Sequence, residues 1–381
     1  MEAKIYEDGF ERSFGKEESD IMRQFLAERE DAASWKSIDA NQVRFESVTQ
    51  GAPTGSLLMQ SYEMLGKAGV IKDTMANTQL LMTTEEEVYP VRSCALASIL
   101  NRARISGNAL NKVSKDVLAE ILNHCLSVAS GQALLRVSDE KVSAMHGGDE
   151  HEYSVLAMPE LFDLVVDRLQ NDFNSLKFVG GHFDHTLVTA VWELPDEPEL
   201  EDNYKQMLQD HHLGGGEFVP AVRFCSSDVG FSSATVYPML IMNGRNITLG
   251  SPLKLEHKHG ATLADFDKQL TLLYPRCKDA IQQMGELMDI GIDHPYNTML
   301  RVLHKLNAPK KLSYEAAEQW RAVNGDRECT AYELYIAMCE VVFLLQCSGA
   351  SGSKIAKTEE NIARALKVRW GDYDYAGEVN W

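Results

Sequence analysis

The stretch FVPAVRFCSSDVGFSSATVYPMLIMNGRNITLGSPLKLEHK, residues 218–258, decides the fold class. It contains three apolar runs, at 218–227, 233–242 and 247–258, separated by short segments rich in glycine, serine and asparagine. Apolar runs with such short connections are typical of antiparallel strands joined by tight turns. We therefore expect an antiparallel sheet at the centre of the chain.

The same reading extends in both directions from this stretch. Upstream, strands are expected at 175–184 and 185–194, and a hairpin is expected to turn at Asp139-Glu140. Helices are predicted before the hairpin and between it and these strands, and one of them begins after Ser114, a residue suited to the N-cap position. Downstream, from 261 to 370, apolar residues recur at helical spacing. The predicted fold is α+β: an antiparallel sheet core with inserted helices, followed by a helical C-terminal domain.

These elements suggest a division of the chain into segments. We expect an acidic N-terminal arm with little contribution to the core (1–45), an α+β core domain (46–260), a helical domain (261–346), and a linker, helix and acidic aromatic tail (347–381). The acidic connection PDEPELEDN, residues 195–203, is a further candidate loop. The glycine turn GAPTGS, residues 51–56, lacks the lysine of a phosphate-binding loop and does not support nucleotide binding there.

Composition limits the cellular setting. The seven cysteines are scattered without a CxxC pair, which indicates reduced thiols and not a disulfide framework or a zinc ribbon. The N-terminal residues are polar and acidic, and no apolar run approaches the roughly 20 residues of a membrane span. We therefore expect a cytoplasmic protein that does not enter the membrane.

The net charge of -19 is unevenly distributed. Residues 1–90 sum to -8 and residues 151–220 to -11, whereas residues 91–150 sum to +1 and residues 221–310 to +2. A chain that coats nucleic acid uniformly is excluded by the total, because phosphate binding depends on clustered lysine and arginine. The two less acidic segments could still form a basic face.

Several cations in or near these segments are candidates for contact with phosphate. A short positive strip near the end of the last strand and a cluster at a joint between two predicted helices lie within them, and a lysine pair lies where the second segment ends. The candidate nucleic-acid-binding residues are Arg102, Arg104, Lys254, Lys258, Lys310 and Lys311.

A second interpretation concerns His257 and His259. At i and i+2 on a strand, both rings would project from the same face, which is a spacing used by metal sites. No carboxylate follows the pair closely, so a divalent metal at these histidines is the less favoured alternative. Otherwise no cofactor is expected.

The C-terminal segment GDYDYAGEVNW, residues 371–381, is acidic and aromatic. A conformationally free tail of this kind combines charge for steering with rings for a pocket. We expect Tyr373, Tyr375 and Trp381 to be candidates for docking to a partner protein, with a disordered tail as the alternative.

A family resemblance rests on motifs in the centre of the chain. They are the strand, turn and Lys-Val-Ser-Ala strand of Arg136–Ala144, the Ser-Asp-Val-Gly turn and serine-rich strand of Ser227–Val236, Asn243-Gly244, and a basic strand that ends at a histidine. In roughly residues 90–300 the chain resembles the phage/plasmid-like family of unknown function that is carried by prophages, plasmids and integrating elements. It departs from the family pattern after Ala144. The resemblance implies a mobile-element context and carries no established activity.

Three functional hypotheses follow. The first is a non-enzymatic phage or plasmid DNA-metabolism protein that can form a homo-oligomer and that binds DNA, with a single strand as the expected ligand, in recombination or replication. The second is a counter-defence interaction protein whose acidic surface mimics nucleic acid or blocks a host protein. The third is a metal-dependent enzyme that uses His257 and His259.

Overall fold

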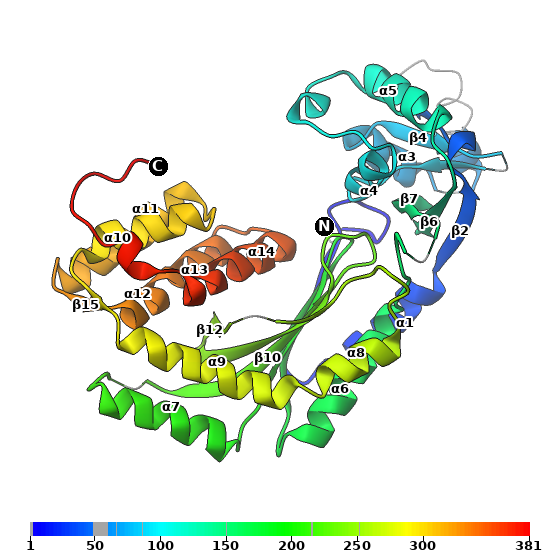
Figure 1. Ribbon diagram of the computed structural model, residues 1–381. Helices are drawn as coiled ribbons and strands as arrows, with labels where there is room; N and C mark the ends of the chain where they lie inside the picture. Colours follow the sequence, from blue (N-terminus) through cyan, green and yellow to red (C-terminus); the bar gives the residue numbers. More distant parts are fainter. Residues whose placement is uncertain are drawn as a thin grey trace.

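The protein was analysed as a computed structural model that describes residues 3–48, 60–65, 67–85, 87–149, 151–214, 216–250 and 252–381 (Figure 1). The glycine turn at 51–56, considered above for nucleotide binding, lies outside the described residues.

The main sheet is antiparallel and contains the strands that the central stretch predicts. Its order is β1-β8-β9-β10-β11-β12, and β13 pairs with β11. The strands are β1 (Glu11–Phe14), β8 (Lys177–Asp184), β9 (Val188–Glu193), β10 (Phe218–Ser226), β11 (Ala234–Met242), β12 (Arg245–Thr248) and β13 (Leu253–Leu255). The α+β fold class is confirmed.

Both faces of this sheet are buried, and successive side chains along the central strands point alternately to one face and the other. Val222 and Phe224 on β10 face the larger core, whereas Ala221 and Cys225 on the same strand face a smaller apolar cluster with Tyr237. Helices cover the larger-core face along the lower side of the sheet in Figure 1: α1 (Ser19–Asp31), α6 (Met158–Asp172), α7 (Pro198–Asp210), α8 (Leu263–Leu270) and α9 (Leu273–Met288).

The C-terminal helices share the core of the sheet. They are α10 (Pro295–Lys305), α11 (Lys310–Asn324), α12 (Ala331–Met338), α13 (Glu340–Cys347) and α14 (Gly352–Ala363). The Tyr204 and Tyr332 hydroxyls are 2.6 Å apart, which links α7 to α12. A buried ion pair between Arg223 on β10 and Glu359 on α14 fastens α14 to the sheet. The predicted helical region is therefore present and is packed into the same core.

A second unit, at the upper right of Figure 1, has its own core. One small sheet contains β2 (Ala33–Asp39), β6 (Gln132–Ser138) and β7 (Lys141–Gly147), and the other contains β3 (Arg44–Ser47), β4 (Leu80–Thr83) and β5 (Val88–Pro90). Helices α3 (Ala68–Ala76), α4 (Ala95–Arg102) and α5 (Lys115–Ser127) pack around them. We call this unit the N-terminal unit.

Two local predictions in the N-terminal unit are confirmed. The β6–β7 hairpin turns at Asp139 and Glu140, both with positive φ. The Ser114 side chain accepts a hydrogen bond from the Val117 amide and caps α5.

Two other expectations are wrong. The N-terminal residues are not an arm outside the core, because β1 pairs with β8 and Phe14, Met22 and Phe25 are buried in the larger core. Sequence reading missed this contribution because it depends on a partner strand about 170 residues away. The acidic connection after Pro195 is mostly helix α7, since Pro198 occupies its first turn, where no amide donor is needed, and Leu200 and Tyr204 bury one face.

Candidate functional site

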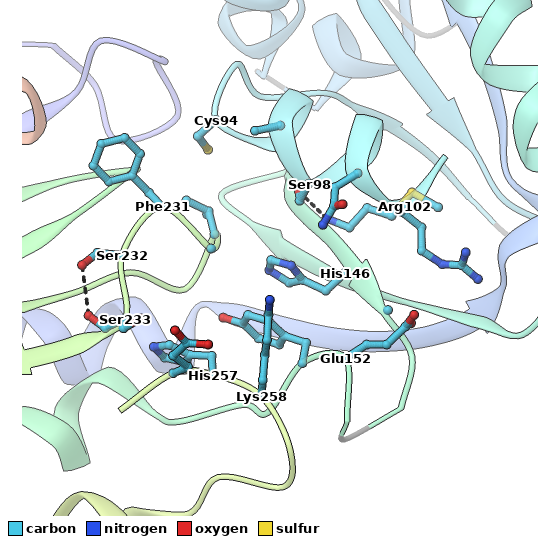
Figure 2. A pocket seen from close by; sticks show the side chains of 18 of the residues that line it. Cys94, Ser98, Arg102, His146, Glu152, Phe231, Ser232, Ser233, His257 and Lys258 are labelled. Carbon is cyan, nitrogen blue, oxygen red and sulfur yellow. Dashed lines mark hydrogen bonds between the residues drawn. The ribbon is translucent and has the colours of Figure 1, made fainter. Parts of the chain in front are cut away.

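A cleft of about 1120 Å³ lies where the N-terminal unit meets the end of the main sheet (Figure 2). Five parts of the chain line it: residues 93–104 around α4, residues 145–147 and 151–153 from the end of β7 onward, Thr186 in the β8–β9 turn, residues 229–233 in the β10–β11 turn, and residues 256–259 after β13. These segments are far apart in sequence, so the cleft is a product of the tertiary fold.

The β10–β11 turn forms one side of the cleft. The Ser227 hydroxyl accepts hydrogen bonds from the amides of Val229 (3.3 Å) and Phe231 (3.1 Å), and Gly230 supplies a positive φ of 77°. This is the local role expected of a serine at a strand end. The turn holds Phe231 at the cleft with 48% of its surface exposed, and Figure 2 shows it on the opposite side of the pocket from Arg102.

A stack of aromatic rings forms a wall of the cleft. The His146 and Tyr153 rings are parallel with centroids 3.6 Å apart, and the Tyr153 and His257 centroids are 5.5 Å apart. The Tyr153 hydroxyl donates to the Asp228 carbonyl at 3.0 Å, and His146 Nε2 lies 3.2 Å from the same oxygen. The two hydrogen bonds connect residues 146 and 153 to the start of the β10–β11 turn, and the ring contact adds His257 to the same surface.

Both stacked histidines are held neutral. Burial lowers the pKa of His146 to about 4, and burial also lowers the pKa of His257. Both ring nitrogens of His257 have partners, since Nδ1 lies 3.3 Å from the Ser154 carbonyl and Nε2 lies 3.4 Å from the Ser226 hydroxyl. Burial leaves these two rings as structural parts of the wall.

The strand geometry expected for a metal site at His257 and His259 is wrong. Strand β13 ends at Leu255, so the two histidines follow in a turn: His257 is buried and His259 is exposed with a φ of 60°. They do not project together from one strand face. In the described part of the chain, no three His, Cys, Asp or Glu side chains are grouped so that they could hold a metal ion.

The cleft collects three of the six cations predicted to contact phosphate, Arg102, Arg104 and Lys258. Arg104 and Lys258 are exposed, and within the described ranges neither forms an ion pair. In Figure 2 the Lys258 side chain points toward His146. The acidic side chains among the described lining residues are Glu152 and Glu256.

Arg102 has a structural role as well. Its guanidinium donates to the carbonyl oxygens of Ser130 (2.8 Å) and Gln132 (3.1 Å), which ties the end of α4 to the segment before β6. These bonds reduce its capacity to contact a ligand.

The other three predicted cations lie elsewhere. Lys254 on β13 pairs with Glu256 at 2.8 Å and is not part of the cleft lining. Lys310 and Lys311 begin α11, which lies with the C-terminal helices, away from the N-terminal unit in Figure 1. The structure does not unite the six cations in one surface.

The expectation of a conformationally free C-terminal tail is also wrong. Arg301 on α10 donates hydrogen bonds to the carbonyl oxygens of Tyr373 (3.2 Å) and Gly377 (3.0 Å), and its guanidinium covers the Tyr375 ring. The Trp381 ring stacks on His304 at 5.0 Å. The three predicted docking residues are therefore engaged by the chain's own helices.

Sequence reasoning missed several lining residues. From the sequence, four of them were assigned to no site: His146, His151, Tyr153 and Phe231. The two histidines in HGGDEHEY, residues 146–153, could have indicated a site, because histidines often take part in binding and catalysis. Phe231 carried no signal, because its exposure depends on the turn geometry.

No protein-family model, curated protein or solved structure matches this chain. Among the described residues, every helix is too short or too polar to cross a membrane.

Proposed function

We propose that the protein binds single-stranded nucleic acid in this cleft, with single-stranded DNA as the expected ligand. The observation that carries the proposal is that Arg104 and Lys258, which form no ion pair in the described structure, line the same cleft as the exposed Phe231. These two cations stand out because the chain as a whole has a net charge of -19. Cations can neutralise phosphates, and an exposed ring can stack on a base.

The size and chemistry of the cleft support a ligand that is a short strand of nucleotides. Small-molecule pockets usually measure about 300–1,000 Å³, so a cleft of about 1120 Å³ has room for a ligand larger than a drug-sized molecule. Stacking on Phe231 requires an unpaired base, which favours a single strand over a duplex. The resemblance to the phage/plasmid-like family supports a role in mobile-element recombination or replication, and this part of the proposal rests on the resemblance alone.

The test is binding of purified protein to fluorescent single- and double-stranded oligonucleotides across a salt series. We expect saturable binding to the single strand that weakens steeply as salt rises, and the substitutions Arg104→Glu and Lys258→Glu should each weaken binding and reduce the salt slope. The matched control is Lys311→Glu, at a lysine that is also exposed but lies on α11, and it should change neither the affinity nor the salt slope. Absence of binding at low salt would overturn the proposal and favour an acidic protein that engages a host protein.

A further inference from the structure

Histidines are concentrated at the cleft. Four of the chain's eleven histidines, all within the described residues, line it: His146, His151, His257 and His259. Burial and hydrogen bonding hold His146 and His257 in the wall, as described above. The other two, His151 and His259, are exposed and are therefore the pair that a ligand can reach.

The backbone holds His151 and His259 next to one another. The His259 amide donates to the His151 carbonyl at 3.2 Å, and the Ser154 amide donates to the His257 carbonyl at 2.9 Å. These two bonds join residues 151–154 to residues 257–259 in a short ladder. The His151 and His259 ring centroids are 6.5 Å apart, a separation that leaves room for one phosphodiester group between the two rings.

The backbone of His259 has an uncommon conformation. Its φ of 60° is in the left-handed region, which a residue with a side chain seldom adopts and which costs free energy. Strain of this kind persists where surrounding structure imposes it, and it is concentrated at sites that act on ligands. Here the hydrogen bond from the His259 amide to the His151 carbonyl holds this backbone conformation in place.

We propose that His151 and His259, assisted by Lys258, cleave a phosphodiester bond that follows a ribose in the strand held by the cleft. This inference rests on the proposed function, because the strand must first be bound. One imidazole removes the proton of the ribose 2′-hydroxyl, and the 2′-oxygen forms a bond to phosphorus. The bond from phosphorus to the 5′-oxygen breaks, and the second, protonated imidazole gives that oxygen its proton.

The step balances without a further reactant. Its products are a 2′,3′-cyclic phosphate and a 5′-hydroxyl. Lys258 is placed to stabilise the charge that grows on the phosphate oxygens. A ribose substrate is favoured because its nucleophile is already part of the substrate, so an acid and a base are the groups that the protein must supply.

The experiment uses a fluorescent single-stranded DNA oligonucleotide that carries a single ribonucleotide. The all-DNA oligonucleotide of the same sequence is the control substrate. Binding and cleavage are measured on both, in full-length wild-type protein and in His151→Ala, His259→Ala and His124→Ala variants purified identically. His124 is an exposed histidine on α5, outside the cleft. We expect cleavage at the ribonucleotide alone, with a cyclic phosphate end, and no cleavage of the all-DNA strand.

The His151→Ala and His259→Ala substitutions should each lower the cleavage rate by at least about 100-fold, as is typical for loss of a general acid or base. The His124→Ala variant should cleave at the wild-type rate. The wild-type rate should have a bell-shaped pH profile, and each cleft variant should lose one limb. Binding of both oligonucleotides without cleavage would overturn this inference and leave the proposed function intact. Cleavage that persists in the His151 and His259 variants would also overturn it, and absence of binding would remove both proposals.

Discussion

The Asp228 carboxylate lies 3.0 Å from the Arg136 guanidinium, and this pair joins the β10–β11 turn of the main sheet to β6 of the N-terminal unit. Both side chains are largely buried, with 15% and 10% of their surface exposed. The carbonyl of the same aspartate accepts the hydrogen bond from Tyr153. Asp228 thus fixes both the junction of the two units and the aromatic wall of the cleft.

Replacing Asp228 with asparagine should destabilise the protein, because among the described residues it leaves the buried Arg136 charge with only Glu30, at 3.8 Å, as a carboxylate partner. Breaking a buried pair by removing one partner costs about 3 kcal/mol or more. Urea denaturation measures the change in the free energy of unfolding. Asp20→Asn is the matched control: Asp20 pairs with Arg23 but is 94% exposed, so its replacement should cost less than about 0.5 kcal/mol. Equal effects in the two variants would contradict the role given to Asp228.

Phe231→Ala should weaken binding of single-stranded DNA without unfolding the protein. Stacking of a base on an aromatic side chain contributes about 1–3 kcal/mol, so the dissociation constant should rise by roughly 5- to 150-fold. The melting temperature should not change, since almost half of the ring surface is exposed. Phe343, 40% exposed on α13, is the control position, and Phe343→Ala should bind as wild type does. An unchanged affinity in Phe231→Ala would remove the ring from the site.

The sheet and several helix ends could be predicted from sequence because the signals are local. The Asp139-Glu140 turn and the Ser114 cap each depend on a few neighbouring residues, and both were found. The pairing of β1 with β8 and the cover that α14 places on β10 are set by contacts between distant segments. Periodicity within one segment contains no information about such partners.

Individual residues of the candidate site could be predicted from sequence, but their arrangement could not, because it depends on contacts between distant segments. Arg104 and Lys258 were identified by their charge, but nothing local showed that they face one cleft. The expected same-face arrangement of His257 and His259 failed because it assumed that the strand continues past Leu255. Once the strand ends, His257 turns into the core and His259 pairs instead with His151.

The buried His146 makes stability depend on pH. Its pKa is about 4 in the folded protein and about 6.5 in the unfolded chain, so the unfolded chain binds the proton first as pH falls. The contribution to the free energy of unfolding is complete above about pH 6.5 and is lost as pH falls toward 4. A shift of this size corresponds to about 3 kcal/mol. The titratable and charged side chains that face His146 are His257 and Arg136, and the Asp228 backbone carbonyl lies 3.2 Å from its Nε2.

The measurement is urea denaturation at a series of pH values for wild type, His146→Gln and His124→Gln. Between pH 6.5 and 4, His146→Gln should lose less stability than wild type, because the glutamine has no proton to take up. His185 and His257, whose pKa values burial also lowers, remain in every variant and should leave a residual slope. His124→Gln should reproduce the wild-type slope. A wild-type slope in His146→Gln would show that this ring is not the group that titrates.

The C-terminal tail supplies the cap that α10 lacks. His294, at the N-cap of α10, makes no capping bond with its own side chain. The Asp374 carboxylate accepts instead from the amides of Asp293 and His294, both at 2.8 Å, and from the Thr298 hydroxyl at 3.1 Å. A tail residue thus satisfies amides that the helix terminus leaves without partners.

Asp374→Ala should therefore lower the free energy of unfolding by about 1 kcal/mol, the usual cost of losing an N-terminal cap. It should also loosen the tail, so that amide hydrogen exchange at residues 373–381 becomes faster than in wild type. Asp372→Ala is the matched control, because Asp372 is an exposed acid two residues earlier that does not contact α10 through its side chain in the described structure. Faster exchange in Asp374→Ala alone would establish that the tail is held on α10 by this carboxylate, whereas unchanged exchange would leave Arg301 and Trp381 as its anchors.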